Sequence, residues 1–218
     1  HKLSKLSEAI TNIHFPENKE KLNEAQNRFK FEELFFLELL VALRKNIHKE
    51  NLKGVALKVS TSLVKDFLNK LPYELTDSQL NVLREIRRDL EDTKPMNRLL
   101  QGDVGSGKTI VALIAMLIAV DSGYQAAIMA PTEILANQHF INIKEILKDF
   151  DINVYLLIGG QKKSERKKEL EKIEAGGKSI IVGTHALLED SVLFDKLGLV
   201  IIDEQHRFGV AQREFLEQ

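Results

Sequence analysis

The positions of apolar and polar residues divide the chain into two parts with different periodicities. From Asn18 to Asn46 apolar residues recur at the spacing of one helix face, which predicts a long amphipathic helix. A second helix is predicted from Ser60 to Leu71, because Pro72 cannot continue it. Beyond Pro72 short apolar runs alternate with helical stretches. We therefore predict a helical linker region over residues 1–71 and an α/β domain over residues 72–218.

The second part predicts a parallel β-sheet that is covered by helices on both faces. Its short apolar runs are bounded by Gly, Asp or Pro, as strands are, and the segments between them have helical periodicity. In such a sheet ligands gather at the carboxyl ends of the strands. The predicted strands are Arg98–Gln101, Gln125–Ala130, Asn153–Ile158, Ser179–Gly183 and Leu197–Asp203. The predicted helices are Gln79–Glu91, Thr109–Asp121, Thr132–Asp149 and Lys163–Glu174.

Composition narrows the class of protein only modestly. A formal net charge of -1 over 218 residues gives no overall basic surface, so any contact with nucleic acid would depend on local patches. The absence of cysteine excludes disulfides, thiol catalysis and cysteine-bound zinc. No apolar run approaches the length of a bilayer span, and the N-terminus lacks the layout of a signal peptide. We therefore expect a cytoplasmic protein without a membrane partner, and a first residue other than Met predicts a piece of a longer chain.

The segment Gly102–Thr109 carries the strongest chemical signal. It matches the phosphate-binding loop pattern G-x-x-x-x-G-K-[ST] at each defined position, between a predicted strand and a predicted helix. Its glycines let backbone amides converge, and the helix N-terminus adds partial positive charge, which suits the phosphates of ATP. We expect Lys108 to reach the terminal phosphates and Thr109 to hold Mg²⁺. The alternative is a glycine-rich turn before a buried helix, with Lys108 solvated. The residues expected to contact ATP here are Gly102, Asp103, Val104, Gly105, Ser106, Gly107, Lys108 and Thr109.

Two adjacent carboxylates follow the last predicted strand. Asp203 stands where phosphate-loop ATPases hold Mg²⁺, and Glu204 where they polarise the attacking water. Adjacent acids at a strand end are common by chance, but their combination with the upstream phosphate loop is not. We therefore predict an ATPase in which Lys108, Asp203 and Glu204 carry the catalysis.

The segment Asp203–Val210, which reads DEQHRFGV, resembles motif II and its extension in the RecG family of superfamily-two DNA helicases. Other segments agree in order and spacing, so the resemblance covers nearly the whole chain. Leu75–Gln79 resembles the Q motif, Ala130–His139 motif Ia and Gly183–Leu187 motif Ib, while Ile13–Pro16 and Phe31–Phe35 resemble the segment that joins the family's wedge domain to its motor.

The resemblance implies a RecA-like, P-loop NTPase lobe with ATP and Mg²⁺ as its ligands. It also implies a parent protein that translocates on branched or double-stranded DNA and remodels stalled replication forks and Holliday-type junctions in repair and recombination. A second RecA-like lobe and a wedge domain would belong to the same parent chain. We therefore expect the present chain to be weak or inactive by itself.

Particular residues receive roles from the same resemblance. Gln79 would contact the adenine, Thr132 and Thr184 would contact DNA phosphates, and His206 and Arg207 would couple the nucleotide state to DNA. From the residues alone, Gln79 reads more readily as a surface residue and Thr132 equally well as a helix cap. Two other functions stay open: a nucleotide-responsive DNA-binding module without catalysis, and a transcription-repair coupling translocase, whose family usually carries Gln at the position of His206.

Overall fold

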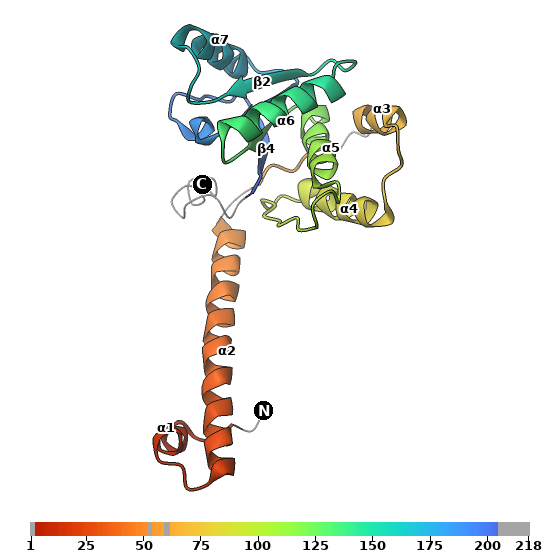
Figure 1. Ribbon diagram of the computed structural model, residues 1–218. Helices are drawn as coiled ribbons and strands as arrows, with labels where there is room; N and C mark the ends of the chain where they lie inside the picture. Colours follow the sequence, from red (N-terminus) through yellow and green to blue (C-terminus); the bar gives the residue numbers. More distant parts are fainter. Residues whose placement is uncertain (1–2, 52–53, 59–61, 205–218) are drawn as a thin grey trace. The chain divides into compact units, whose positions relative to one another are not determined.

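The computed structural model describes residues 3–51, 54–58 and 62–204, and it divides into two compact units, His1–Lys53 and Gly54–Gln218 (Figure 1). The candidate coupling residues His206 and Arg207 lie outside the described residues. Within the described part, no helix is both long enough and apolar enough to cross a membrane.

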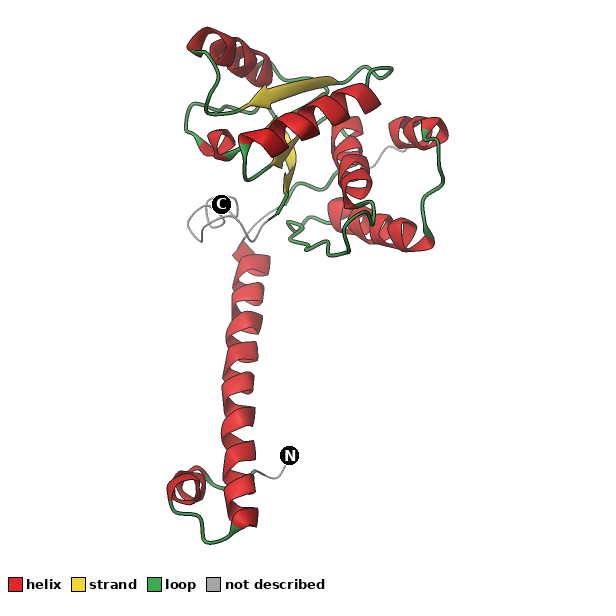
Figure 2. Cartoon of the chain, viewed as in Figure 1, coloured by secondary structure: helices red, strands yellow, loops and turns green. Residues whose placement is uncertain are grey.

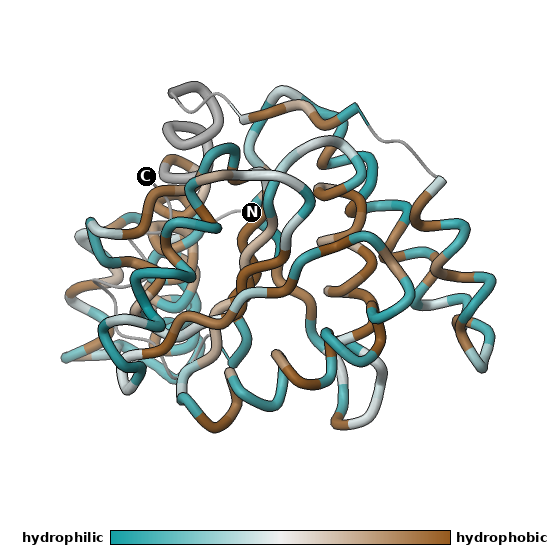
Figure 3. The backbone as a smooth tube through the Cα atoms, turned by 90° about the horizontal axis from the view of Figure 1, so that it is seen from above, coloured by the Kyte–Doolittle hydropathy of each residue, from teal (hydrophilic) through white to brown (hydrophobic). Residues whose placement is uncertain are grey.

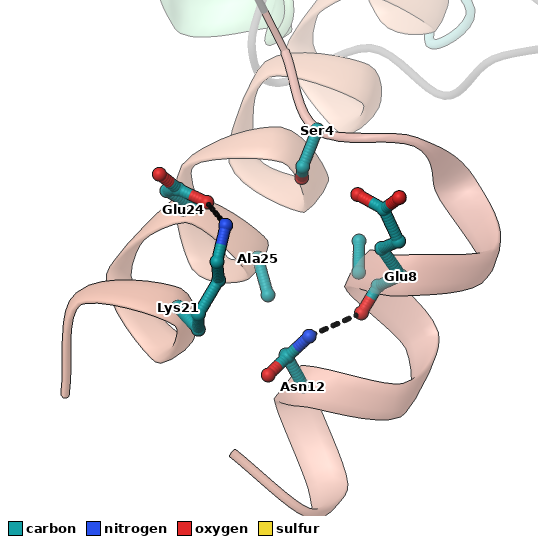
Figure 4. Close-up of a pocket in the computed structure, with 7 residues that line it drawn as sticks. Ser4, Glu8, Asn12, Lys21, Glu24 and Ala25 are labelled. Atoms are coloured by element: carbon teal, nitrogen blue, oxygen red, sulfur yellow. Dashed lines mark hydrogen bonds and ion pairs between the residues drawn. The ribbon is translucent and has the colours of Figure 1, made fainter. Parts of the chain in front are cut away.

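The first unit is a pair of helices, α1 (Leu6–His14) and α2 (Lys19–Asn51). The predicted long helix is confirmed as α2. Small side chains let the two helices approach, because Ala9 and Ala25 are both buried where they meet. A cavity of about 10 Å³ remains beside them, with Asn12 donating to the Glu8 carbonyl oxygen on its wall at 2.9 Å (Figure 4). That volume holds about one water molecule, so the cavity is a packing feature rather than a ligand site.

The second unit contains a four-stranded parallel sheet in the order β2-β3-β1-β4, with helices on both faces (Figure 2). This confirms the predicted α/β class. The strands are β1 (Gln125–Met129), β2 (Asn153–Leu157), β3 (Ser179–Gly183) and β4 (Leu197–Ile202). The helices are α3 (Ser62–Lys70), α4 (Asp77–Glu91), α5 (Lys108–Asp121), α6 (Glu133–Ile146), α7 (Lys163–Glu174) and the 3-10 helix η1 (His185–Leu188).

Strand alternation sends neighbouring side chains into two separate cores. Ala126 and Ile128 of β1 face the core that contains α5 and α6, whereas Ala127 and Met129 face the core that contains Ile173 of α7. Helix α5 is apolar nearly all round and almost entirely buried, as expected for a helix enclosed by other elements. The strands and α5 accordingly appear as mostly hydrophobic segments of the tube in Figure 3.

The compact units divide between Lys53 and Gly54, whereas we placed the end of the linker region at residue 71. Helix α3 lies in the intervening segment and packs on α5. The buried Phe67 of α3 contacts the Phe150 ring, with 5.9 Å between the ring centroids. The helix therefore contributes to the core of the second unit.

The predicted strand Arg98–Gln101 is wrong, because these residues form no ladder in the structure. Arg98 instead pairs with Glu85 and Asp89 of α4, with 2.8 Å between its Nε and the Asp89 Oδ2. Leu99 is 73% exposed. Two adjacent leucines look like part of a strand in the sequence, but a strand forms only where a neighbour offers backbone partners. The ion pairs of Arg98 attach this segment to α4 instead.

Candidate nucleotide-binding site

The loop before α5 curls because two of its glycines adopt the left-handed conformation. Gly105 has φ 81° and Gly107, the N-cap of α5, has φ 80°. A side chain in either place would be strained, since L-residues rarely adopt this region. Helix α5 begins at Lys108, so the loop leads straight into a helix N-terminus, where the first amides lack partners within the helix. The predicted loop thus has the local geometry of an anion site.

Lys108 lies over its own loop. Its Nζ donates to the carbonyl oxygens of Gly102 and Asp103, at 2.7 Å each. An ammonium group has three donors, so one remains after these two bonds. The alternative in which Lys108 is only solvated therefore does not describe the structure. These two bonds hold the side chain along the loop.

Gln79 connects the loop to the start of α4. Its Oε1 accepts from the Thr76 amide at 2.9 Å, and its own backbone amide donates to the Thr76 Oγ1 at 3.3 Å, which completes a capping box. Its Nε2 donates to the Ser106 carbonyl oxygen at 3.0 Å. Gln79 thus links α4 to the loop through a hydrogen bond, a role that the sequence pattern did not reveal.

The close approach of Gln79 also explains one glycine. A Cβ added at Gly107 would lie 2.3 Å from Gln79 Nε2, whereas a Cβ added at Gly105 would meet nothing within 4 Å. Both positions need a positive φ, but only Gly107 needs the missing side chain for space as well. Both glycines are therefore required by the backbone conformation, and Gly107 is required by the lack of space as well.

Asp203 stands directly after β4, where its amide donates to the Met129 carbonyl oxygen at 2.9 Å. Its Oδ2 lies 2.7 Å from Nε2 of His139, which is on α6. Because an ionised carboxylate only accepts hydrogen bonds, the imidazole donates here. That bond is the main cause of a pKa of Asp203 below its ordinary value, and partial burial opposes it. A hydrogen bond from the Glu204 backbone amide and the charge of Lys108 lower the pKa further, so Asp203 is an ionised carboxylate at the end of β4.

Glu204 has φ 52°, and among the described residues no other residue except glycine has a positive φ. Such strain of about 1–3 kcal/mol persists only where the surroundings hold it, and it gathers at functional sites. The strained turn brings the second carboxylate immediately after Asp203, at the carboxyl edge of the sheet. The structure thus agrees with the sequence in placing both acids at this edge.

The two candidate DNA contacts differ in exposure. Thr132 is exposed and caps α6, where its Oγ1 accepts from the Leu135 amide at 3.3 Å. Thr184 is 1% exposed, and its Oγ1 accepts from the Ala186 amide at the start of η1. Both threonines therefore act as caps here. A surface role is open to the Thr132 hydroxyl, whereas the Thr184 hydroxyl is enclosed.

The residues at this edge fit a magnesium nucleotide. The loop offers amides and an ammonium group to phosphates, and the Asp203 carboxylate, bonded through Oδ2 to His139, has further lone pairs for a metal ion. Mg²⁺ is typically held by one or two protein oxygens together with phosphates and water, so a cage of three acids is not needed. No group of three or more metal-binding side chains occurs in the described ranges, which agrees with that mode.

A larger hollow of about 690 Å³ lies elsewhere, between β2, α6 and α7. None of its lining residues belongs to the phosphate loop. At one side of it the Gln161 amide group donates to the Leu156 carbonyl oxygen at 2.8 Å and accepts from the Ile158 amide at 3.2 Å. Gln161 thus occupies backbone groups on the outer edge of β2, as a neighbouring strand would. The hollow is not part of the candidate nucleotide site.

Comparison with known proteins identifies a family whose model matches this chain. A model of the DEAD/DEAH box helicase family matches residues 76–218. The chain is 45% identical over 213 residues to the ATP-dependent DNA helicase RecG of Synechocystis, covering 98% of this chain and 26% of that protein. It is 47% identical over 217 residues to RecG of Thermotoga maritima, covering 99% of this chain and 27% of that protein.

A solved structure extends the likeness to three dimensions. The structure of RecG bound to a three-way DNA junction superposes with a TM-score of 0.86 at 44% sequence identity, over 96% of this chain and 28% of that chain. The present chain therefore spans about a quarter to a third of the length of the relatives that it matches.

Proposed function

Because the chain belongs to the DEAD/DEAH box helicase family, we propose that it is the ATP-binding lobe of a RecG-like DNA helicase. The observation that carries the proposal is the loop Gly102–Thr109, in which Gly105 and Gly107 have a positive φ and which leads into the N-terminus of α5 at Lys108. Asp203 follows β4 as an ionised carboxylate, and the charge of Lys108 is the smallest of the causes that lower its pKa. An ammonium group on a phosphate loop and a carboxylate after a strand suit an anionic nucleotide with its magnesium ion.

Lys108 would exchange carbonyl oxygens for phosphate oxygens when ATP enters the loop. Its present partners, the carbonyl oxygens of Gly102 and Asp103, hold the chain of the lysine along the loop. Thr109 and Asp203 would hold Mg²⁺, which neutralises charge on the phosphate oxygens when it is bound. Glu204 would accept a proton from the attacking water. Pre-placed charges of this kind act on the transition state without reorganising.

Gln79 would contact the adenine while it keeps the loop in place. Its Oε1 and one N–H are used by Thr76 and Ser106, which leaves one N–H and one lone pair for a base. A base bound there could shift the Gln79 side chain and thereby its hydrogen bond to the Ser106 carbonyl oxygen of the loop. Adenine recognition and loop geometry would thus depend on one side chain.

The whole protein would use ATP turnover to move on branched or double-stranded DNA, acting in the cytoplasm on stalled forks and junctions. The exposed N-cap Thr132 is suited to a DNA phosphate, because a hydroxyl and helix N-terminal amides face outward together. Thr184 would contact a phosphate only after its present cap opens. A second lobe and a wedge domain of the parent chain would complete the motor.

The test uses the full-length protein and its Lys108→Ala variant. We expect DNA-stimulated ATP hydrolysis to fall by about 100-fold or more, because the variant lacks the charge that meets the terminal phosphates. Exposed Lys163 at the start of α7 provides a matched control, and Lys163→Ala should keep the wild-type rate. Undiminished turnover in Lys108→Ala would reject the proposed site. Binding of nucleotide without any turnover by the wild type would favour a non-catalytic DNA-binding module instead.

Comparison of DNA substrates separates the remaining alternative. We expect stronger stimulation by a forked or three-way junction than by a plain duplex. Equal stimulation by a plain duplex together with dependence on a stalled RNA polymerase would favour a transcription-repair coupling translocase.

A further inference from the structure

His139 has a place at the candidate site that the proposed function does not assign. It lies on α6, 64 residues before Asp203 in the sequence, yet its Nε2 is 2.7 Å from the Asp203 Oδ2. The imidazole is 14% exposed and the Asp203 side chain 34%, so the pair is partly shielded from water. An ordinary surface pair of this kind would contribute little, but a shielded charge-assisted hydrogen bond has a defined direction.

The bond restrains the orientation of the Asp203 carboxylate. The backbone of Asp203 is held by the bond from its amide to Met129, and the carboxylate then turns only about its side-chain torsions. With Oδ2 accepting from His139 and the carboxylate also accepting from the Glu204 backbone amide, its rotation is restrained, and its remaining lone pairs have a fixed direction toward a ligand. Carboxylates that bind metal ions are commonly oriented by such outer hydrogen bonds.

We propose that His139 is a positioning residue that orients the Asp203 carboxylate toward the magnesium ion of the bound nucleotide. This inference rests on the proposed function, because it assumes that Asp203 holds the metal ion. His139 itself contacts neither the metal ion nor the nucleotide in this scheme. Its contribution passes entirely through the donated hydrogen bond.

Two substitutions separate the hydrogen bond from packing. His139→Leu fills a similar space without a donor, and His139→Gln carries an amide N–H that reaches about as far as Nε2. Asn142→Ala serves as a control, since Asn142 is exposed on the next turn of the same helix. All three are made in the full-length protein.

The first measurement is the binding of a fluorescent ADP analogue with Mg²⁺ and with EDTA. We expect His139→Leu to weaken the magnesium-dependent gain in affinity by about tenfold, the lower end for lost outer-shell partners. Binding in EDTA should be unchanged, and His139→Gln should recover most of the gain. Equal weakening in EDTA would show a general structural role and overturn the proposal, as would wild-type magnesium dependence in His139→Leu.

The second measurement is ATP turnover as a function of the Mg²⁺ concentration. His139→Leu should need several-fold more Mg²⁺ for half-maximal turnover, with His139→Gln closer to the wild type. Lys108→Ala is assayed in parallel to keep the two proposals apart. If Lys108→Ala abolishes turnover while His139→Leu keeps the wild-type magnesium requirement, only the role of His139 fails. If Lys108→Ala has no effect, the proposed nucleotide site itself fails.

Discussion

The two ends of the parallel sheet differ in how far their polar side chains are buried and hydrogen-bonded within the protein. At the amino end Gln125 is 1% exposed, and its Nε2 donates to the Ile173 carbonyl oxygen at 2.9 Å and to the Ser179 Oγ at 3.0 Å. Its Oε1 accepts from the Asp195 amide at 2.9 Å. At the carboxyl end the Asp203 side chain is 34% exposed and has one oxygen bonded to His139.

The difference separates stability from function within one set of strands. Both N–H groups of the Gln125 amide donate to partners inside the protein, as a buried amide must if its burial is not to cost stability. Lys108 has one donor left after its two bonds, Asp203 has further lone pairs, and Glu204 has a strained backbone. A ligand can bind to hydrogen-bonding groups that are held in place and not fully used within the protein. Parallel strands concentrate it at one edge, because all their carboxyl ends point the same way.

The largest effect on this contrast is expected from Gln125→Leu. The substitution removes three hydrogen bonds: the Asp195 amide loses its partner, while the Ser179 hydroxyl and the Ile173 carbonyl oxygen keep only their bonds with Gly177 and Gly176. We expect a loss of about 2–4 kcal/mol in the free energy of opening the sheet. Hydrogen exchange of β1 and β3 in the full-length protein would measure it.

The KM for ATP should change little in Gln125→Leu, because no residue of the phosphate loop touches Gln125. A large rise in KM with unchanged exchange of the strands would contradict the division between the two ends.

A smaller effect is expected at the carboxyl end from two alanine substitutions in the loop. Gly107→Ala brings a Cβ to 2.3 Å from the Gln79 Nε2 and also needs φ 80°, whereas Gly105→Ala needs φ 81° alone. Strain alone costs about 1–2 kcal/mol, and displacement of Gln79 adds to it only in the first variant. Nucleotide affinity, measured with a fluorescent analogue, should therefore fall further in Gly107→Ala.

The matched pair gives a clear negative outcome. If Gly105→Ala weakens nucleotide binding as much as Gly107→Ala does, then contact between Gln79 and the loop has no influence on the site.

The smallest effect concerns acid pH, to which only the carboxyl end should respond. The folded-state pKa of Asp203 is lowered, chiefly by the bond from His139, so this interaction stabilises the fold above the unfolded pKa, about pH 4. The stabilisation is lost as the pH falls through the lowered folded pKa. Partial exposure of Asp203 keeps the contribution small.

Thermal unfolding of the wild type and His139→Leu at neutral and acid pH checks this expectation. Their difference in midpoint should shrink in acid, while the difference between the wild type and Gln125→Leu should persist, since an amide does not titrate. A His139→Leu difference that grows in acid would contradict the assigned sign.

Particular elements explain how far the sequence alone could reach. Strand β3 and helix α7 begin and end at the predicted residues, because β3 is a short apolar run that ends at Gly183 and α7 is a segment free of Gly and Pro that ends before Gly176. Arg98–Gln101 fails, since a strand depends on a neighbour and these residues are tied to α4 instead. Helix α1 was not predicted, although the short segment before Pro16 has apolar residues at helical spacing.

For the site, the chemical types of the residues were visible and their connections were not. The spacing of glycines, lysine and threonine in Gly102–Thr109 reflects local backbone geometry, so the sequence alone predicts a phosphate loop. Alternating strands and helices likewise determine that the chain folds as an α/β lobe with its polar residues at one edge. Both follow from interactions between residues that are close in the sequence.

Only the tertiary structure decided which residues meet. His139 and Asp203 are 64 positions apart, and Gln79 and Ser106 are 27 apart, and in each pair a side chain reaches an atom supplied by another element. Such contacts depend on how α4, α5, α6 and β4 pack around shared cores, which no local period encodes. Because of this packing, Gln79 at the start of a helix binds the phosphate loop, and His139 in the middle of a helix binds the candidate metal-binding carboxylate.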